Sequence, residues 1–170
     1  MKRVLLGLGS NRCYEGKSPI ELLECAKTDI KHYLSDIVFS SVYKTKAMYV
    51  EEQDDFYNMA LSGFVSDDID AFDFLRIINN IEYKYGRNRS NEIRFGPRSL
   101  YIDIELFGDD IINEPDLQIP HIRMKERAFV LIPALEVLIH PSDKAVKAKC
   151  ESYLEALNAA GKVEGIEKLE

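Results

Sequence analysis

The sequence predicts an α+β domain with a ferredoxin-like split-βαβ fold, in which helices pack on an antiparallel sheet. Hydrophobic periodicity indicates the element order βαββαβ with additions at the C-terminus, and this order is typical of that fold. The length of 170 residues suits one ordinary domain. No internal repeat, low-complexity tract or linker divides the chain. We therefore expect residues 1–170 to form a single domain, with helices on one face of the sheet and the other face free to carry a site.

The first half of the chain contains three predicted strands and one helix. Residues 3–9 (RVLLGLG) form an apolar run that predicts a buried strand. After a Ser-Pro pair, residues 20–34 place their apolar side chains close to helical spacing. Strands are predicted at about 36–45 and 56–65. The polar stretch between these two strands is too long for a tight hairpin turn.

The second half begins with a predicted helix at 68–86, which starts at an Asp68 or Asp70 cap and ends at Gly86. A basic loop at 87–98 follows it. The remaining predicted elements are a strand at 99–107, a Pro-punctuated loop, an apolar segment at 128–138, a helix at about 143–160 closed by Gly161, and an edge strand within 162–169.

The composition excludes several classes of protein. The net charge of −7 argues against a general nucleic-acid binder, whose surface is normally basic. The three cysteines are widely spaced and form no CxxC pair, which argues against a disulfide scaffold or a zinc site. No apolar stretch approaches the roughly 20 residues of a membrane span, and the N-terminal apolar run is too short for a signal peptide. We therefore expect a cytoplasmic protein with no nucleic-acid or membrane partner.

The stretch RFGPRSLYIDIELFG, residues 94–108, runs from a basic loop into an unusual strand. Because successive strand side chains point to opposite faces, two carboxylates share one face with aromatic side chains. That face is predicted to carry Ser99, Tyr101, Asp103, Glu105 and Phe107, and the opposite face Leu100, Ile102, Ile104 and Leu106. Carboxylates two residues apart can hold magnesium together with phosphate oxygens and water. An edge strand with solvated acids would produce the same pattern.

The loop before this strand is strongly basic within an acidic protein. Its cations are Lys84, Arg87, Arg89, Arg94 and Arg98, against Glu92 as the one acid. Arginine binds phosphate oxygens through two parallel hydrogen bonds, so this loop beside a carboxylate strand indicates a nucleoside triphosphate. A solvated loop that balances nearby acids is the alternative. The chain has neither a GxGxxG dinucleotide fingerprint nor a GxxxxGK[ST] P-loop.

Two further clusters combine polar and aromatic residues. Thr45, Phe56 and Asn58 flank the polar loop between two strands, an arrangement that can stack a flat polar ring and hydrogen-bond its edge. Aromatic and Asn side chains near strand ends are also common without any ligand. In IPHIRMKERAFVL, His121 can contact a nucleotide or satisfy a loop carbonyl, and Phe129 follows a run of cations.

Together these pieces resemble one family, the 6-hydroxymethyl-7,8-dihydropterin pyrophosphokinases. The matching landmarks occur in family order over essentially the whole chain. They are GLGSN at 7–11, S-x-Y-x-T at 41–45, F-x-N at 56–58, IE-x3-GR-x-R at 81–89, R-[aromatic]-GPR at 94–98, D-I at 103–104, PH-x-RM-x-x-R at 120–127 and FVL-x-P at 129–133. The GPR motif before an acidic strand, followed by PH…R…FVL, is the most specific part of this combination.

The resemblance implies the family's reaction and partners. The hydroxymethyl group of the dihydropterin attacks the β-phosphorus of ATP, the pyrophosphoryl group is transferred and AMP leaves, which is a step of folate biosynthesis. Catalysis of this kind depends mainly on positioning and charge stabilisation, with Mg²⁺ and arginines holding the polyphosphate in line. The implied partners are the small molecules ATP and a hydroxymethyl dihydropterin, and we expect the chain to act as a monomer.

The resemblance also assigns roles by matching position. The residues implied to contact ATP are Asn79, Glu82, Arg89, Arg94, Arg98, His121 and Arg127. Those implied to hold the pterin are Thr45, Met48, Phe56, Asn58, Phe95 and Phe129, with the pterin ring between Phe56 and Phe129. Arg94, Arg98 and Asp103 are implied to be catalytic, with both arginines on a loop that closes over the ligands.

Several positions depart from the family pattern. That pattern is GPR-x-L-D-x-D, with two aspartates that bind two magnesium ions. Here Tyr101 occupies the first aspartate position and only Asp103 remains. A phenol is neutral near pH 7 and substitutes poorly for a metal-binding carboxylate. In addition, Lys46 and Ala47 replace the usual prolines after the Thr, and Phe95 replaces a tryptophan.

The Tyr101 change leaves three interpretations open. Asp103 alone can hold the metal with water and phosphate, or Glu105 can join Asp103 if the metal shifts about 6–7 Å along the strand. In the third, the chain is a weakened paralogue that binds nucleotide or pterin, or acts on a related acceptor. We favour retained activity because the arginines, Asn58 and His121 persist. An RNA-binding module on a similar sheet ranks low, since the RNP aromatic pattern is absent and the net charge has the wrong sign.

Overall fold

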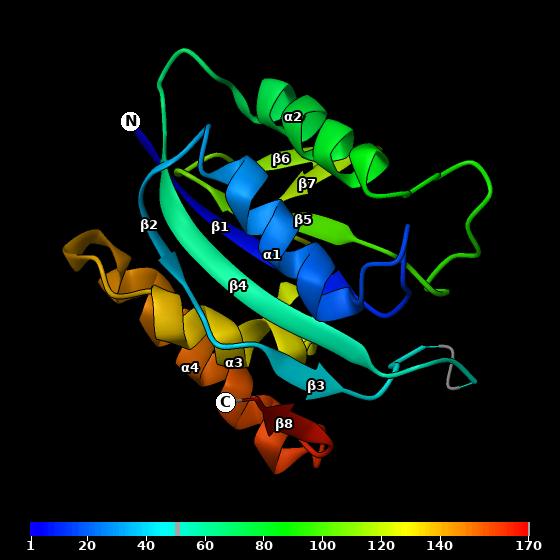
Figure 1. Cartoon of the computed structure of the whole chain (residues 1–170). Coiled ribbons are helices and arrows are strands. Elements are labelled where there is room, and N and C mark those ends of the chain that lie inside the picture. Colours follow the sequence, from blue (N-terminus) through cyan, green and yellow to red (C-terminus); the bar gives the residue numbers. More distant parts are fainter. Residues whose placement is uncertain (50–51, 170) are drawn as a thin grey trace.

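A six-stranded antiparallel sheet is the frame of the computed structural model, which describes residues 1–49 and 52–169 (Figure 1). At its centre lies β1 (Lys2–Ser10), an almost continuous apolar strand with both faces covered. It pairs with β4 (Phe56–Val65) on one side and with β5 (Tyr101–Phe107) on the other. Residues far apart in the sequence are therefore neighbours along these three strands.

Three shorter strands complete the sheet. β3 (Tyr43–Thr45) pairs with β4, and β8 (Ile166–Lys168) pairs with β3 as the outer edge. β2 (Ser35–Phe39) pairs with the other end of β4. β1 and β4 therefore lie in the middle of the sheet. Along the chain, β2 and β3 take the place of one predicted strand, and the order of the elements otherwise confirms the predicted α+β, ferredoxin-like fold.

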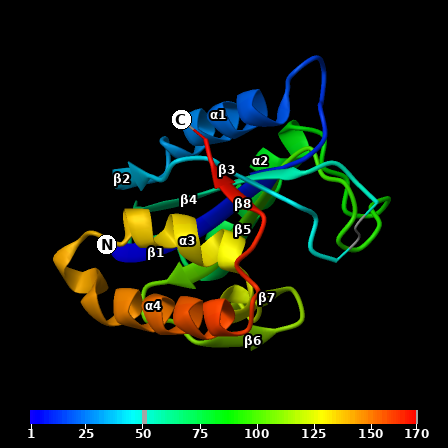
Figure 2. The same ribbon diagram turned by 90° about the horizontal axis from the view of Figure 1, so that it is seen from below.

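Two capped helices cover one face of the sheet. α1 (Pro19–Ile30) begins at Ser18, whose side chain forms a capping box with Glu21. α2 (Ala71–Lys84) begins at Asp70, which is the second of the two predicted caps. Both helices bury their apolar stripes against the strands, and Figure 2 shows them together on one side of the sheet.

The opposite face is covered over much of its length by two more helices. α3 (Ala128–Val137) and α4 (Lys144–Ala159) pack over Leu5 of β1 and Ala60 of β4. The expectation of a second face free of helices is therefore wrong. Two 3-10 turns flank these helices, at Met124–Glu126 and Pro141–Asp143. None of the helices in the described part of the chain is long and apolar enough to cross a membrane.

Two predicted segments differ from the structure. The segment 36–45 is not one strand, because Ser40 separates β2 from β3. Its backbone N–H donates to the carbonyl oxygen of Ala60, and its side-chain Oγ accepts from the N–H of Ala60. The Pro-punctuated loop contains a small hairpin, β6 (Ile112–Glu114) and β7 (Leu117–Ile119). Tertiary pairing decides both features, and three-residue strands carry little periodicity.

A β-bulge changes the faces of β5. Leu6 pairs with Ile104 and Leu5 pairs with Leu106, so Glu105 has no partner on β1. Beyond the bulge the alternation is reversed. Phe107 joins the core under α1 and α2, and Leu106 packs on the α3–α4 side. The predicted faces are therefore correct up to Ile104 and wrong for Leu106 and Phe107.

Candidate active site

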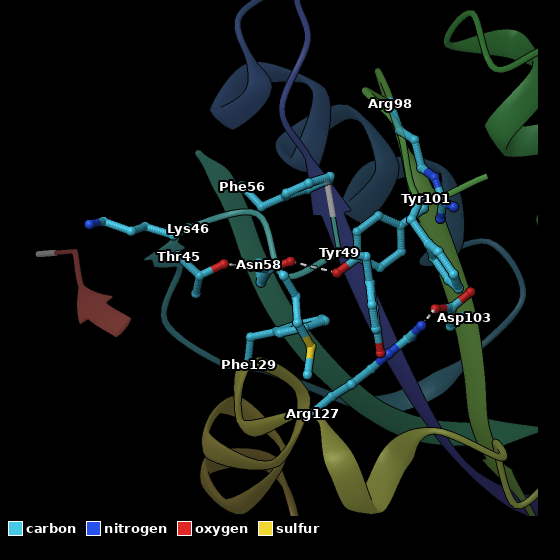
Figure 3. A pocket seen from close by; sticks show the side chains of 12 residues that line it. Thr45, Lys46, Tyr49, Phe56, Asn58, Arg98, Tyr101, Asp103, Arg127 and Phe129 are labelled. Atoms are coloured by element: carbon cyan, nitrogen blue, oxygen red, sulfur yellow. Dashed lines mark hydrogen bonds and ion pairs between the residues drawn. The ribbon is translucent and has the colours of Figure 1, made fainter. Parts of the chain in front are cut away.

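A pocket lies at the end of the sheet near Tyr101 (Figure 3). Strand residues line it together with residues of the loop that follows β3 and of the loop that precedes β5. All the residues that the sequence predicts to hold a pterin line it: Thr45, Met48, Phe56, Asn58, Phe95 and Phe129. Arg98, Tyr101, Asp103 and Arg127 line the same pocket. Its free volume is about 50 Å³, well below the roughly 300 Å³ or more of typical ligand pockets. In this conformation the pocket is filled largely by its own side chains.

Tyr101 forms the floor of the pocket, and Gly9 makes room for it. The two residues pair across β1 and β5. A Cβ on Gly9 would lie 2.1 Å from Cε1 of Tyr101, so only glycine fits beneath this ring. Phe56 meets the ring edge-on at 6.1 Å, and the Arg98 guanidinium lies 5.8 Å from its centre. Burial first, and the nearby charge of Asp103 second, raise the pKa of Tyr101, so the phenol stays neutral.

A line of hydrogen bonds crosses the floor from β5 to β3. The Tyr101 hydroxyl donates to Oδ1 of Asn58 at 2.5 Å. Nδ2 of Asn58 donates to Oγ1 of Thr45 at 2.7 Å. All three side chains are buried, and each takes part in one or both of these hydrogen bonds. The strand pairing brings these residues together, since β4 lies between β1 and β3.

Asp103 is the one carboxylate that lines the pocket among the described residues. Nη1 of Arg127 lies 3.3 Å from its Oδ2, and Nε2 of His121 lies 3.9 Å from the same oxygen. Burial lowers the pKa of His121, although Asp103 acts in the opposite direction. For Arg127, burial acts to lower the pKa, but the charge of Asp103 and the neighbouring tyrosines outweigh it and raise the pKa. These three predicted residues therefore converge at one end of the pocket.

Glu105 is not brought to the pocket. Its side chain lies beside Gly7, where a Cβ would lie 3.0 Å from Oε1 of Glu105. The side chain is fully buried, and neither carboxylate oxygen has a hydrogen-bond partner among the described residues. Burial first, and the charge of Asp103 second, raise its pKa well above the usual range.

A second hollow lies over the C-terminal end of α2. Asn79, Glu82 and Arg89, all predicted to contact ATP, line it together. Arg89 donates to Oε1 of the buried Glu82 at 2.8 Å. Burial raises the pKa of Glu82 against the opposing charges of Arg87 and Arg89. Oδ1 of Asn79 is buried without a partner, so it is available to a ligand's hydrogen-bond donor.

Asn11 is a functional candidate to which the sequence analysis gave no role, and Arg87 was named there only as one cation of the basic loop. Arg87 is buried, donates to Glu82 and lies 3.1 Å from Glu92, so it anchors the basic loop to α2. Asn11 binds the backbone of Arg98 through its own backbone and side chain, and its Nδ2 donates to Asp54 O at 3.0 Å. Both residues belong to quoted motifs, GR-x-R and GLGSN, which were the available signal.

One residue of the loop after β3 contacts one residue of the loop before β5 at the pocket. Tyr49 stacks on Phe95 with the ring centres 4.2 Å apart, although the sequence assigned no role to Tyr49. Arg94 does not line the pocket; its guanidinium lies 5.0 Å from the Phe95 ring, on the outer side of the same loop. Phe95 has a φ of +60°, a left-handed conformation that is unusual for an aromatic residue. The stacked pair fills space that a flat ligand would occupy.

The chemistry of the pocket is thus divided. One end offers aromatic rings and a buried polar edge, which suits a flat heterocycle with hydrogen-bonding groups. The other end offers guanidinium groups and one carboxylate, which suits a polyphosphate and a cation. In the described part of the chain, no three His, Cys, Asp or Glu side chains converge to hold a metal ion. Any metal here would need ligand atoms from elsewhere.

Comparison with known proteins finds similarity to one family. A family model described as 7,8-dihydro-6-hydroxymethylpterin-pyrophosphokinase (HPPK) matches residues 5–139. The chain is 37% identical to the 2-amino-4-hydroxy-6-hydroxymethyldihydropteridine pyrophosphokinase of Bacillus subtilis (strain 168), over 66% of this chain and 65% of that one. The protein of the same name from Helicobacter pylori is 32% identical over 77% of this chain and 78% of its own length.

Longer proteins contain a similar part. The folic acid synthesis protein FOL1 of Dictyostelium discoideum is 42% identical over 61% of this chain, which is 16% of its own length. A crystal structure of Plasmodium falciparum HPPK-DHPS has a TM-score of 0.63 at 16% identity, over 99% of this chain and 47% of that one. At this identity the structural likeness shows the shared fold. The match to the Bacillus and Dictyostelium proteins covers less than two thirds of their lengths.

Proposed function

This chain belongs to the 7,8-dihydro-6-hydroxymethylpterin-pyrophosphokinase family, and we propose that it transfers the pyrophosphoryl group of ATP to 6-hydroxymethyl-7,8-dihydropterin. AMP is the second product, and the reaction is a step of folate biosynthesis. The observation that carries this proposal is the convergence of the predicted pterin residues with Arg98, Arg127 and Asp103 in one pocket. We further propose that the chain works as a cytoplasmic, single-domain monomer, because one chain supplies all of these residues and its three cysteines are free thiols.

The reaction is a displacement at the β-phosphorus. The oxygen of the hydroxymethyl group forms a bond to the β-phosphorus as the bond from that phosphorus to the oxygen bridging it to the α-phosphate breaks. That oxygen leaves with AMP, and the hydroxyl proton is released. The protein has little covalent chemistry to perform, so positioning and charge stabilisation carry most of the rate enhancement.

The aromatic end of the pocket would position the acceptor. Phe56 and Phe129 lie on opposite sides of the floor and can hold a flat ring between them (Figure 3). Asn58 and Thr45 lie at the buried end, where they can bind the polar edge of the ring. Tyr49 would have to leave its stack on Phe95 as the ring enters, because the free volume is too small.

The cationic end would hold the nucleotide. Arg98 and Arg127 can bind phosphate oxygens at the pocket, with Arg94 joining as its loop closes. A neutral His121 can donate one hydrogen bond to phosphate. Asn79, Glu82 and Arg89 line the neighbouring hollow and would bind the nucleoside portion and adjoining phosphate. Loop closure over both substrates would exclude water and so protect ATP from hydrolysis.

Mg²⁺ fits this site only in part. Asp103 lines the pocket and is partly exposed, which suits an ion that takes one or two carboxylates and completes its shell with phosphates and water. Tyr101 is neutral and hydrogen-bonded to Asn58, and Glu105 is buried away from the pocket, so neither offers a second carboxylate. We propose that Asp103 alone holds one Mg²⁺ brought by ATP. When bound, that ion would neutralise phosphate charge.

A weakened paralogue is the second candidate, and Tyr101 is the observation that favours it. The deciding experiment mixes the purified protein with Mg²⁺, ATP and 6-hydroxymethyl-7,8-dihydropterin and measures AMP and the pterin diphosphate. AMP that forms only when the pterin is present would establish the proposed reaction. Binding of either ligand without AMP, at high protein concentration, would overturn it and favour the paralogue.

A further inference from the structure

Three buried side chains in the pocket are hydrogen-bonded in a fixed order. Tyr101 donates to Asn58, and Asn58 donates to Thr45; dashed lines in Figure 3 mark these two hydrogen bonds. The exposed fractions are 5%, 2% and 4% for Tyr101, Asn58 and Thr45, so all three side chains are almost fully buried. We call these residues the Tyr101–Asn58–Thr45 relay. Each comes from a different strand: β5, β4 and β3.

Tyr101 has little freedom to turn its hydroxyl away from Asn58. Its ring lies over the bare backbone of Gly9, where even a methyl group would collide. Phe56 and Arg98 flank the ring. An amide oxygen only accepts hydrogen bonds, whereas a neutral phenol both donates and accepts. Within the described part of the chain, the acceptor of the Tyr101 hydroxyl hydrogen is Oδ1 of Asn58. The Tyr101 hydroxyl therefore holds Oδ1 of Asn58 toward β5 and leaves its NH₂ group toward β3.

This orientation determines what Thr45 can do. Oγ1 of Thr45 accepts a hydrogen bond from Asn58, so its own hydroxyl hydrogen must find another acceptor. Among the residues that the structure describes, no acceptor is hydrogen-bonded to that hydrogen. Thr45 lines the pocket, and a ligand there can supply the acceptor.

We propose that Tyr101 is a positioning residue that acts through Asn58 and makes the Thr45 hydroxyl a hydrogen-bond donor to the acceptor substrate. The edge that fits is a ring nitrogen or a carbonyl oxygen of a flat heterocycle held by Phe56 and Phe129. This inference rests on the proposed function and adds to it the residue that determines the polarity of the pterin edge site. Without the Tyr101 hydroxyl the Asn58 amide can turn over, and Thr45 then donates to Asn58 instead of the ligand.

A double-mutant cycle tests the relay. Tyr101→Phe removes the hydroxyl and keeps the ring over Gly9, and Thr45→Val removes the donor at similar volume. Equilibrium affinity for 6-hydroxymethyl-7,8-dihydropterin is measured by calorimetry, with affinity for a non-hydrolysable ATP analogue alongside. Each single change is expected to weaken pterin binding about tenfold, and the double change also about tenfold, because both act on one hydrogen bond. Affinity for the nucleotide is expected to stay within about twofold.

The controls separate the possible failures. Tyr33→Phe removes the hydroxyl of a tyrosine beyond α1, far from the pocket, and should leave both affinities unchanged. If the parent protein binds no dihydropterin, the proposed function is overturned, and this inference with it. If the parent binds but the two losses multiply to about a hundredfold, the relay is overturned alone. As a second readout in the free protein, the Asn58 side-chain amide resonances should shift in Tyr101→Phe and not in Tyr33→Phe; no shift would also overturn the relay.

Discussion

The ring of Tyr101 occupies the space that any side chain on Gly9 would need, since a Cβ there would lie 2.1 Å from Tyr101 Cε1. The two residues face each other across β1 and β5. This contact links the GLGSN segment to the tyrosine that departs from the family pattern. It also explains how a large side chain fits on the floor of a small pocket.

The Gly9–Tyr101 contact predicts a stability effect. Gly9→Ala is expected to lower the free energy of unfolding by about 1–3 kcal/mol, because the buried ring cannot move aside. Urea unfolding measures this free energy in Gly9→Ala, in Tyr101→Ser and in the double variant that combines the two changes. The double variant should lose less than the two single changes added together. Simple additivity would show that the ring is not the obstacle.

Asp103 is predicted to be essential for turnover. Asp103→Asn keeps the shape and removes the charge that faces Arg127 and the proposed cation. The expected loss in kcat is about a thousandfold or more, because metal stabilisation of phosphoryl transfer is worth several kcal/mol. Asp116→Asn, in the exposed turn between β6 and β7, is the matched control and should turn over normally. Normal turnover by Asp103→Asn would refute the metal assignment.

Glu105 is predicted to act in stability and not in metal binding. Its two buried, unpartnered oxygens cost folding free energy, so Glu105→Met is expected to stabilise the protein by about 1–3 kcal/mol in urea unfolding. Turnover and its Mg²⁺ dependence should not change in Glu105→Gln. A loss of turnover like that of Asp103→Asn would instead make Glu105 a metal ligand.

Tyr101→Asp is predicted to change the metal stoichiometry. The parent protein with a non-hydrolysable ATP analogue should bind one Mn²⁺ per chain in a paramagnetic resonance titration, because Asp103 is the one carboxylate among the described residues that lines the pocket. A second carboxylate two residues away on the same face should add a second ion. At saturating pterin, kcat of the variant should be unchanged or higher, while its affinity for the pterin should fall because the Tyr101 hydroxyl is lost. Two ions in the parent protein would contradict the proposed single-cation site.

Glu136 makes the anchoring of β3 and β8 to α3 dependent on pH. Burial alone would raise its pKa, but hydrogen bonds from the Ser41 backbone, the Tyr43 hydroxyl and Lys168 lower it overall. A lowered pKa in the folded state stabilises the protein above the usual carboxyl pKa and loses that effect as the pH falls. Glu136→Gln should therefore cost about 1 kcal/mol in urea unfolding at pH 7 and clearly less at pH 3.5. An equal cost at both values would exclude the ionised carboxylate as the cause.

Most of the fold was predictable because its elements carry strong local signals. α1 and α2 have apolar stripes at helical spacing and recognisable caps, and β1 and β4 are long apolar strands. β6 and β7 were missed because three-residue strands have no measurable period. α4 was predicted as a helix at about 143–160, but its place on the second face of the sheet was not predicted. α3 was not predicted as a helix because it is apolar all round, and its sequence does not distinguish a helix from a buried strand.

The candidate site, like the fold, was predictable from the sequence in part. The residue types can be read directly from the sequence: the arginine-rich loop, the aromatic residues, Asp103 and the Tyr101 substitution. Which of them come into contact depends on how the strands pair and how the helices cover the sheet. Glu105 lies buried beside Gly7 and outside the pocket, and strand pairing places Asn58 between Tyr101 and Thr45. Burial beneath another element and a hydrogen-bond partner on another strand both depend on contacts between distant segments, and local sequence patterns do not contain those contacts.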